Sequence, residues 1–255
     1  MARSVLGFIQ PIPWPSFEVG ETHAELVFPK EGLSALIPLE TISYYDKKMK
    51  HPTLREETDL QKKGYKFIAG VDEVGRGPLA GPVVAGAFMI LPGFQMPTAL
   101  RKRLRDSKKL SATKRLEFYK FFHSHPHVKW GIGIVSEKVI DKVNILQATR
   151  LAMKKAVSQL EHAQAIIVDG RMMIETPLFQ KAIVKGDEKV FSCAVASIMA
   201  KVTRDKMMVR YHKKYPEYGF DKHKGYGTRS HFEQLRLHGP CDIHRKSFAL
   251  NLART

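Results

Sequence analysis

The sequence is poor in cysteine and has no long apolar run. Cys193 and Cys241 are the only cysteines in 255 residues, which excludes the disulfide-built folds of small secreted proteins and indicates a reducing compartment. No apolar run approaches the roughly 18 to 20 residues that a membrane-spanning helix needs. The run at residues 5–9 is too short for a signal peptide and is soon followed by Pro11. We therefore expect a cytoplasmic protein that does not bind membranes.

Acidic residues are scarce relative to basic ones. The chain has 42 Lys and Arg against 25 Asp and Glu, a formal net charge of +17. Residues 1–65 contain 8 basic and 9 acidic residues, so the excess of positive charge lies in the rest of the chain. Such an excess favours a polyanionic partner such as nucleic acid, although ordinary solubility charge is the competing interpretation. With 44% hydrophobic residues, the chain can build one sizeable α/β domain and an appendage.

The most informative stretch is GVDEVGRGPLAGP at residues 70–82. It begins at the end of a short apolar run, residues 67–71, which predicts a buried strand. Asp72 and Glu73 follow where this strand leaves the core. Adjacent carboxylates can hold a divalent metal. A bare pair of acids is more often a solvated surface turn, but the whole string favours a functional site.

The same string continues with Gly75, Arg76 and Gly77. Glycines without side chains allow a ligand to lie directly against the main chain. Arg76 adds a planar positive group that suits phosphate. Together with the two acids, this turn indicates a phosphate-containing substrate.

Alternating strand and helix patterns follow along the chain. Strands are predicted at residues 67–71, 79–90, 128–135 and 165–168. Helices are predicted after Ser111, at residues 145–160 and at residues 193–210. Ser111 is a plausible N-cap, and Leu116, Tyr119 and Phe122 form the apolar stripe of the first helix. This alternation is typical of an α/β domain whose sheet is covered by helices.

Two further acids have chemically suggestive positions. Asp169 directly follows the predicted strand at residues 165–168 and precedes a glycine. Asp205 lies three residues after Val202 and seven after Ile198, on the apolar face of a predicted helix. A buried acid is costly unless a positive group meets it, so either an ion pair or a bound metal would explain Asp205. Four acids from separate segments would converge on a Mg²⁺ or Mn²⁺ site.

The first part of the chain reads differently. Prolines within residues 1–22 predict an extended lead-in, and residues 24–39 fit a β-hairpin. Residues 46–63 are charge-rich and read as a linker or surface helix. We expect residues 1–64 to form a small N-terminal extension and residues 65–255 to form the catalytic domain.

From residue 65 to the C-terminus, the chain resembles the ribonuclease HII family, also called type 2 ribonuclease H. The motif at residues 70–82 is followed, in family order, by DSKKL (106–110), IVDG (167–170), VKGD (184–187), AKVTRD (200–205), HKGYGT (223–228) and IHRKSF (243–248). The arginine at position 76 favours type 2 over the related type 3 enzymes. Residues 1–64 have no counterpart in a minimal member of the family.

The resemblance implies a fold and an activity. The fold is α/β and ribonuclease H-like, a mixed five-stranded sheet flanked by helices. The activity is metal-dependent hydrolysis of the RNA strand of RNA/DNA hybrids and nicking 5′ of ribonucleotides embedded in duplex DNA. The products carry 5′-phosphate and 3′-hydroxyl ends, and the role is removal of misincorporated ribonucleotides. We expect a monomer that uses Mn²⁺ or Mg²⁺.

The resemblance also implies roles for individual residues. The catalytic metal ligands are Asp72, Glu73, Asp169 and Asp205. The substrate-binding residues are Gly75, Arg76, Gly77, Ser107, Lys108, Lys185 and Tyr226. The main chain of residues 75–77 approaches the 2′-hydroxyl, and the ring of Tyr226 lies against the neighbouring deoxyribose.

Two other functions compete with this interpretation. A basic hybrid-binding protein without catalysis would have little use for four acids, because carboxylates repel phosphates unless a metal intervenes. A nuclease specific for DNA would not need the Gly75-Arg76-Gly77 surface. Both alternatives are therefore less favoured than a ribonucleotide-specific endonuclease.

Overall fold

The computed structural model describes residues 51–104, 107 and 110–248. The extended lead-in and the hairpin predicted within residues 1–39 lie outside these residues. None of the helices in the described part of the chain is both long and apolar enough to cross a membrane.

The centre of the domain is a five-stranded mixed sheet. Its strands are β1 (Ile68–Val74), β2 (Val83–Ile90), β3 (Val128–Val135), β4 (Ala165–Asp169) and β5 (Phe179–Ile183). Their order in space is β3-β2-β1-β4-β5. The neighbours β1/β2 and β2/β3 are antiparallel, whereas β1/β4 and β4/β5 are parallel. The expected mixed five-stranded sheet is thus confirmed, and the carboxyl ends of β1, β4 and β5 meet at one edge.

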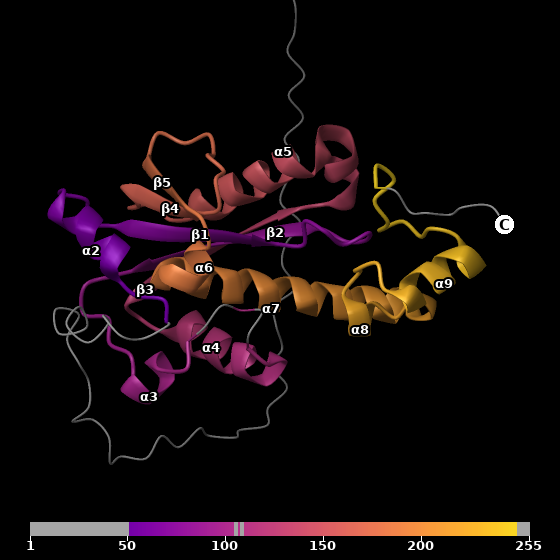
Figure 1. The fold of residues 1–255 in the computed structure, drawn as a ribbon, viewed down its shortest axis with the longest axis horizontal. Coiled ribbons are helices and arrows are strands. Elements are labelled where there is room, and N and C mark those ends of the chain that lie inside the picture. The colour runs from indigo at the N-terminus through magenta and orange to yellow at the C-terminus, as the bar shows by residue number, and fades with distance from the viewer. Residues whose placement is uncertain (1–50, 105–106, 108–109, 249–255) are drawn as a thin grey trace, which may run out of the picture. The chain divides into compact units, whose positions relative to one another are not determined.

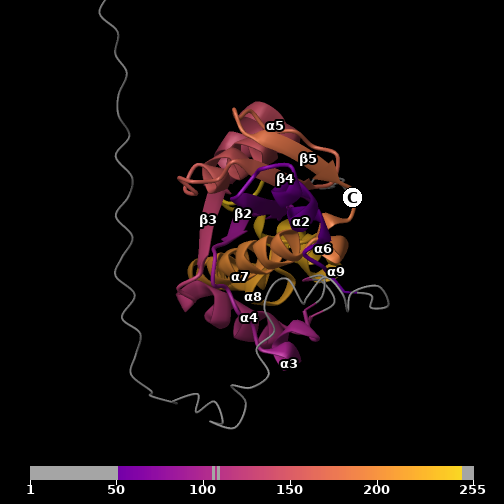
Figure 2. The same ribbon diagram turned by 90° about the vertical axis from the view of Figure 1, so that its left-hand side faces the viewer.

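Helices cover both faces of the sheet. They are α2 (Arg55–Lys62), α3 (Thr98–Arg101), α4 (Ala112–Ser124), α5 (Glu137–Val157), α6 (Gly186–Lys189), α7 (Phe191–Lys214), α8 (Phe220–His223) and α9 (Arg229–His238). Figures 1 and 2 show α5 on one face, α7 on the other, and α4 beyond α7. Each long helix buries its own apolar cluster against the sheet. The layers are those expected for an α/β domain.

Helix α7 packs closely against the central strands because two glycines lie beneath it. A Cβ atom at Gly70 of β1 would be 2.3 Å from the main-chain N of Cys193. A Cβ atom at Gly86 of β2 would be 2.3 Å from the carbonyl oxygen of Ala196. No side chain fits at either place. The close approach brings the first turns of α7 beside the middle of β1, where Asp72 lies.

Helix α4 confirms its predicted start and corrects its predicted face. Ser111 is the N-cap, and its hydroxyl accepts a hydrogen bond from the N–H of Lys114 at 3.3 Å. The buried residues are Phe118 and Phe122, one helical turn apart, whereas Leu116 is 37% exposed. The predicted stripe was correct at Phe122 and wrong at Leu116, because the helix turns its two phenylalanines inward, while Tyr119 packs against the same core cluster and is only partly buried.

The segment predicted as a linker or surface helix contains α2, which is packed on the domain. Leu60 is buried in an apolar cluster with residues of β1 and β4. The buried carboxylate of Glu57 accepts hydrogen bonds from the N–H and hydroxyl of Ser192, at the start of α7, at 2.9 and 2.7 Å. Burial raises the pKa of Glu57 to about 7. The helix therefore contributes to the core of the described domain.

Candidate active site

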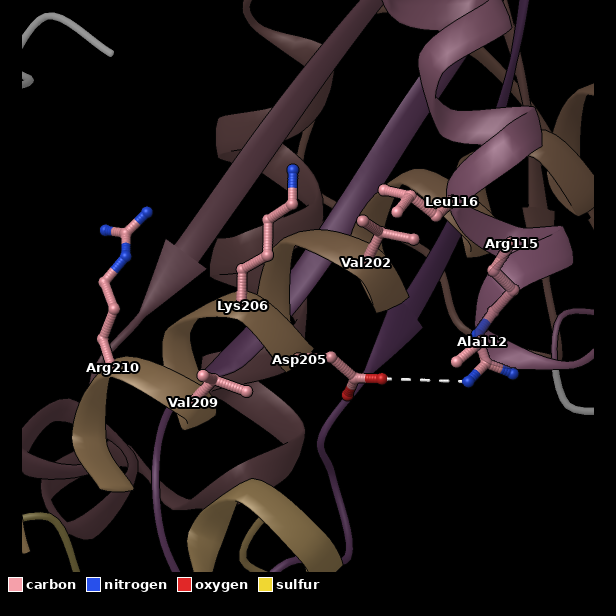
Figure 3. A pocket seen from close by; sticks show the side chains of 8 residues that line it. All are labelled: Ala112, Arg115, Leu116, Val202, Asp205, Lys206, Val209 and Arg210. Atoms are coloured by element: carbon pink, nitrogen blue, oxygen red, sulfur yellow. Dashed lines mark ion pairs between the residues drawn. The ribbon is translucent and has the colours of Figure 1, made fainter. Parts of the chain in front are cut away.

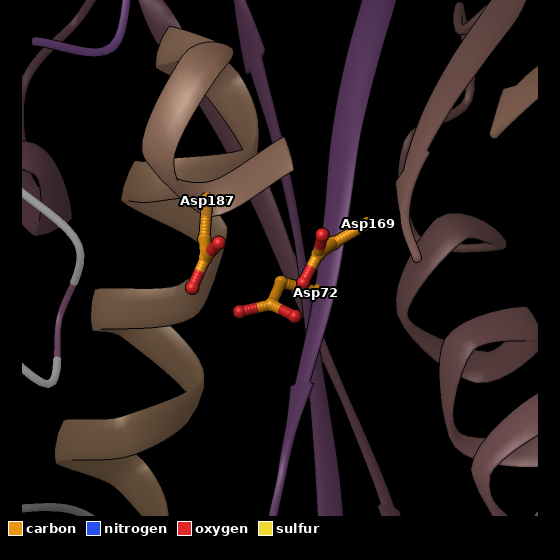
Figure 4. Close-up of side chains that lie close together, drawn as sticks. All are labelled: Asp72, Asp169 and Asp187. Atoms are coloured by element: carbon orange, nitrogen blue, oxygen red, sulfur yellow. The ribbon is translucent and has the colours of Figure 1, made fainter. Parts of the chain in front are cut away.

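Three aspartates meet at the carboxyl edge of the parallel strands. In the β1/β4 ladder Val71 pairs with Val168, so Asp72 and Asp169 follow side by side. Asp187 comes from α6, which begins three residues after β5 ends. One carboxylate oxygen from each aspartate lies within 4.8 Å of the others. Figure 4 shows the three side chains turned toward one another.

The sequence placed Asp72 where the strand leaves the core, whereas the residue is itself still buried. Strand β1 continues to Val74, and Asp72 is only 3% exposed. Burial, followed by the charges of Glu73 and Asp169, raises the pKa of Asp72 well above its usual range. The hydroxyl of Ser197 on α7 donates a hydrogen bond to its carboxylate and acts in the opposite direction.

Asp169 is oriented by the turn that carries Asp187. Its Oδ1 accepts a hydrogen bond from the N–H of Gly186 at 2.6 Å. A Cβ atom at Gly186 would lie 3.2 Å from the Cα of Asp169, so this glycine lets the two segments touch. The lengths of β4 and β5 and this contact together bring the second and third aspartates into one group.

The three aspartates fit a divalent cation. All the ligand atoms are carboxylate oxygens, the donors that hard ions such as Mg²⁺ and Mn²⁺ prefer. Mutual repulsion between these closely spaced carboxylates is unfavourable, and a bound cation would remove it. Asp72, Asp169 and Asp187 could therefore hold the metal on which the predicted chemistry depends.

Glu73 lies beside this group and outside it. Its Oε1 accepts a hydrogen bond from Nη1 of Arg76 at 3.2 Å. Burial raises the pKa of Glu73, and the hydrogen bond and charge of Arg76 oppose the shift. Arg76, in the turn after β1, therefore balances the charge of Glu73.

Asp205 is not brought to the three aspartates. Its carboxylate is 2.8 Å from Nζ of Lys201 and 3.9 Å from Nη2 of Arg115. Figure 3 shows it on α7, joined to Arg115 of α4 by an ion pair. Both residues line a cavity of about 420 Å³. Of the two explanations that the sequence left open, the structure shows the ion pair. Its partners are a lysine one turn earlier on α7 and an arginine from another helix.

Asp187 was missed as a ligand, although the VKGD motif contains it. In the sequence, residues 185–187 look like a phosphate-contacting turn, with ordinary solvated charge as the alternative interpretation. Strand β5, which leads into this turn, has no buried residue and no clear alternation in its sequence FQKAI. Without that strand, nothing in the sequence indicated that residue 187 reaches the edge of the sheet where Asp72 and Asp169 lie.

The two glycines of the Gly-Arg-Gly turn differ in their surroundings. Gly75 has φ +91°, and a Cβ atom there would lie 2.3 Å from Nε of the buried Arg204. A Cβ atom at Gly77 would meet only the ring of Tyr226, at 3.9 Å. Gly75 is therefore required by backbone conformation and packing. Gly77 leaves room beside Tyr226, whose side chain is exposed.

The other predicted substrate-binding residues fall into three situations. Ser107 is buried, and its hydroxyl shares a 2.8 Å hydrogen bond with Ser197, which in turn donates to Asp72. Lys108 lies outside the described residues. Lys185 is exposed at the start of α6, with φ +59°, two residues before Asp187. Ser107 and Lys185 are thus both close in sequence or by contact to the acidic group.

Comparisons with known proteins agree with this architecture. A family model described as Ribonuclease HII matches residues 69–251. Ribonuclease HII of Bacillus cereus (strain G9842) is 50% identical over 193 residues, which are 76% of this chain and 73% of that one. Ribonuclease HII of Bacillus mycoides (strain KBAB4) is 48% identical over the same length and coverage.

Solved structures show the same fold. Ribonuclease H2 from Pyrococcus horikoshii OT3 matches with a TM-score of 0.58 and 26% identity, over 72% of this chain and 94% of that one. A chain in the PCNA:RNase HII complex from Archaeoglobus fulgidus matches with a TM-score of 0.61 and 25% identity, over 74% and 97%.

Proposed function

Because the chain belongs to the ribonuclease HII family, we propose that it nicks duplex DNA on the 5′ side of embedded ribonucleotides. Membership itself establishes a divalent-metal-dependent ribonuclease H, an endonuclease that acts on RNA/DNA substrates. The finer proposal adds the embedded ribonucleotide as the substrate, 5′-phosphate and 3′-hydroxyl ends as the products, and the removal of misincorporated ribonucleotides as the role.

One observation carries the proposal. The turn that follows the catalytic strand β1 places Gly77 beside the exposed ring of Tyr226. The 2′-hydroxyl is the local mark that distinguishes a ribonucleotide from its neighbours. An open main-chain surface can approach that hydroxyl, and an aromatic ring can lie against the next sugar, where an added hydroxyl would collide with it. The pairing of Gly77 and Tyr226 therefore supports recognition of an RNA-to-DNA junction.

We assign metal binding to Asp72, Asp169 and Asp187, with Glu73 as the adjoining acid, and not to Asp205. When bound there, a divalent metal, Mg²⁺ or Mn²⁺, would supply a polarised water nucleophile and neutralise the phosphate charge. The chain's own groups orient the ligands: Ser197 donates to Asp72, and Gly186 donates to Asp169. The side chain of Asp205 is paired with Lys201 and Arg115 instead.

Substrate contacts are proposed for the residues around this edge. Gly75, Arg76, Gly77 and Tyr226 would read the sugar, and Lys108 and Lys185 would contact phosphates. Ser107 is buried, so we assign it to holding Ser197 and, through it, Asp72. The excess of basic residues after position 65 suits a partner that carries one negative charge per nucleotide.

We also propose that the catalytic domain includes α2 and so begins earlier than the predicted residue 65. Deleting residues 1–50 would leave α2 in place, whereas deleting residues 1–64 would remove Leu60 and Glu57. Losing a buried leucine alone costs about 2 to 5 kcal/mol. We expect the longer deletion to lower the melting temperature and the shorter one to leave it nearly unchanged. Equal melting temperatures for the two truncated proteins would return the boundary to residue 64.

The function is tested with three duplexes of one sequence: all DNA, DNA with one ribonucleotide, and a continuous RNA/DNA hybrid. We expect Mg²⁺ or Mn²⁺ to support cleavage 5′ of the ribonucleotide and of the hybrid, and chelator to stop both. The all-DNA duplex should remain intact. Cleavage of the hybrid alone would leave the family activity standing and reject the proposed substrate.

A further inference from the structure

Two arginines are fully buried behind the Gly-Arg-Gly turn. Arg204 of α7 and Arg245 of the C-terminal segment are each 0% exposed. Buried arginines are usually paired with carboxylates. Here the hydrogen bonds of both guanidinium groups, within the described residues, go to main-chain carbonyl oxygens. The pattern indicates that these arginines shape the backbone.

Arg245 binds both ends of the loop between β1 and β2, which begins with the Gly-Arg-Gly turn. Its Nη2 donates to the carbonyl oxygen of Gly75 at 2.5 Å, and its Nη1 donates to that of Arg76 at 2.9 Å. Its Nη2 and Nε donate to the carbonyl oxygen of Gly81 at 2.8 and 3.0 Å. Three carbonyl groups along the turn therefore depend on one planar group. Arg204 binds other carbonyl groups, those of Ala80, Pro82 and Lys224.

Arg245 is itself held in place by contacts of its main chain and side chain. Its N–H donates to the carbonyl oxygen of Leu79 at 2.8 Å, and the ring of Phe248 lies 5.0 Å from its guanidinium carbon. The next residues are anchored to α5, where the carboxylate of Asp141 accepts hydrogen bonds from the N–H of Lys246 and of Ser247 at 3.0 and 2.9 Å. The guanidinium group is thus a fixed point against which the turn is set.

Peptide geometry turns this contact into an arrangement of donors. In a trans peptide the C=O of one residue and the N–H of the next point in opposite directions. With the carbonyl groups of Gly75 and Arg76 directed at Arg245, the N–H groups of Arg76 and Gly77 point away from it. Gly77 is where the ring of Tyr226 approaches. The side of the turn that faces away from Arg245 therefore carries two main-chain donors.

We propose that Arg245 is a positioning residue for ribonucleotide recognition, because it directs the N–H groups of Arg76 and Gly77 toward the 2′-hydroxyl of the substrate. This inference rests on the proposed function. A lysine could not replace it, because an ammonium group lacks the planar fork that binds several carbonyl groups at fixed angles. Burial and the nearby charge of Arg204 lower the pKa of Arg245 to about 9, so it remains charged at neutral pH.

The test measures discrimination rather than rate. Single-turnover rate constants are compared for a duplex with one ribonucleotide and the same duplex with a 2′-fluoro nucleotide at that position. We expect Arg245→Lys to lower the ribonucleotide-to-fluoro ratio about 10- to 100-fold, as misplaced contacts do. Leu235→Ala, buried in α9 of the same part of the domain, is the control: it lowers stability and leaves the ratio unchanged.

A second measurement needs no variant. Hydrogen exchange in the wild-type protein should show fast exchange at the N–H groups of Arg76 and Gly77, and protection by the ribonucleotide duplex greater than by the all-DNA duplex. A wild-type ratio for folded Arg245→Lys, or slow exchange at both amides in the free protein, would overturn the inference. Failure of the wild-type protein to prefer the ribonucleotide would instead reject the proposed function.

Discussion

Like charges lie close together at two places in this domain: three aspartates, two buried and one partly buried, at the carboxyl edge of the sheet, and two buried arginines behind the turn that follows β1. The turn that Arg245 binds begins at Gly75, only three positions after Asp72. At the arginines, carbonyl oxygens accept from both guanidinium groups. At the aspartates, the carboxylates face one another, and this repulsion helps to raise the pKa of Asp72.

This difference indicates that the arginines have a structural role, whereas the aspartates form a binding site. Guanidinium donors are satisfied by neutral carbonyl groups, so the arginine group is complete without a ligand. Carboxylates only accept hydrogen bonds when ionised, and neighbouring carboxylates cannot satisfy them. The N–H of Gly186 satisfies part of the acidic group, and a cation from outside the chain would balance its charge. The turn between the two groups is held from the arginine side and is available to substrate on the other.

The largest effect is expected at the acidic group. Asp72→Asn removes one metal-ligand charge and should lower the cleavage rate by roughly 10³-fold or more, because metal stabilisation supplies several kcal/mol. Without metal, the same change relieves repulsion, so the melting temperature in chelator should stay equal or rise. Cleavage assays and melting curves with and without Mn²⁺ measure both. Near-normal turnover by the variant would reject the assignment.

A matched pair of substitutions separates the third aspartate from the ion-paired one. Asp187→Asn should lower cleavage by roughly 10²-fold or more and weaken the stabilisation that Mn²⁺ gives in melting curves. Asp205→Asn loses contacts with Lys201 and Arg115, at a partly exposed position, and should cost no more than about 1 kcal/mol of stability. It should keep most of its metal response. The reverse order of the two activities would restore Asp205 as a ligand.

On the arginine side of the comparison, the effect should depend on the substrate. Tyr226→Ala should lower activity on one embedded ribonucleotide by about 10-fold, the loss expected from one stacking contact. Activity on a continuous RNA/DNA hybrid should fall much less, because the hybrid has no RNA-to-DNA junction. Tyr226→Phe, which keeps the ring, is the control and should resemble the wild-type protein. Equal losses on both substrates would make Tyr226 a general packing residue.

The smallest effect concerns histidines that support Tyr226. The carbonyl oxygen of Tyr226 accepts a hydrogen bond from Nδ1 of His231 at 2.9 Å. Nε2 of His231 is 3.0 Å from Nε2 of His244, whose Nδ1 accepts from the N–H of Cys241 at 2.9 Å. This series of hydrogen bonds requires both imidazole rings to be neutral. Burial accordingly lowers the pKa of His231 and of His244 to about 4.

The two neutral histidines should make the folded state less stable as the pH falls. An unfolded histidine titrates near pH 6.5, so the folded state binds fewer protons, and its stability is present above that pH and lost as pH falls toward 4. Between pH 7 and 5 we expect each of the two histidines to account for a loss of about 2 kcal/mol. Melting curves of the wild-type protein and of His244→Gln measure it, since other titrating groups cancel in the comparison. Identical pH dependence in the two proteins would contradict the prediction.

Several elements could be predicted from the sequence because their signals are local. The apolar runs that became β1, β3 and β4 were located, and Asp72 and Asp169 were placed with the correct strands. Ser111 was correctly identified as the N-cap of α4. Strand β5 could not be found from its residues, because it lies at the edge of the sheet and buries none of them. Its existence followed only from the family resemblance.

The partner of Asp205 and the position of Asp187 depend on contacts between segments that are distant in the sequence. Asp205 was correctly seen as an acid on an apolar helix face, but its partner Arg115 comes from α4, 90 positions earlier in the chain. Asp187 became part of the acidic group because β4 and β5 are parallel and end at the same edge. No local pattern records which strands pair.

The Gly-Arg-Gly turn shows both contributions at one place. Its composition predicted by itself a turn of glycines with a positive group beside two acids. Its shape depends on Arg245, well over a hundred residues later, which holds the carbonyl groups of Gly75 and Arg76 inward. A local sequence determines which backbone angles are permitted, whereas the direction of each hydrogen-bonding group depends on the partner that the tertiary fold places beside it.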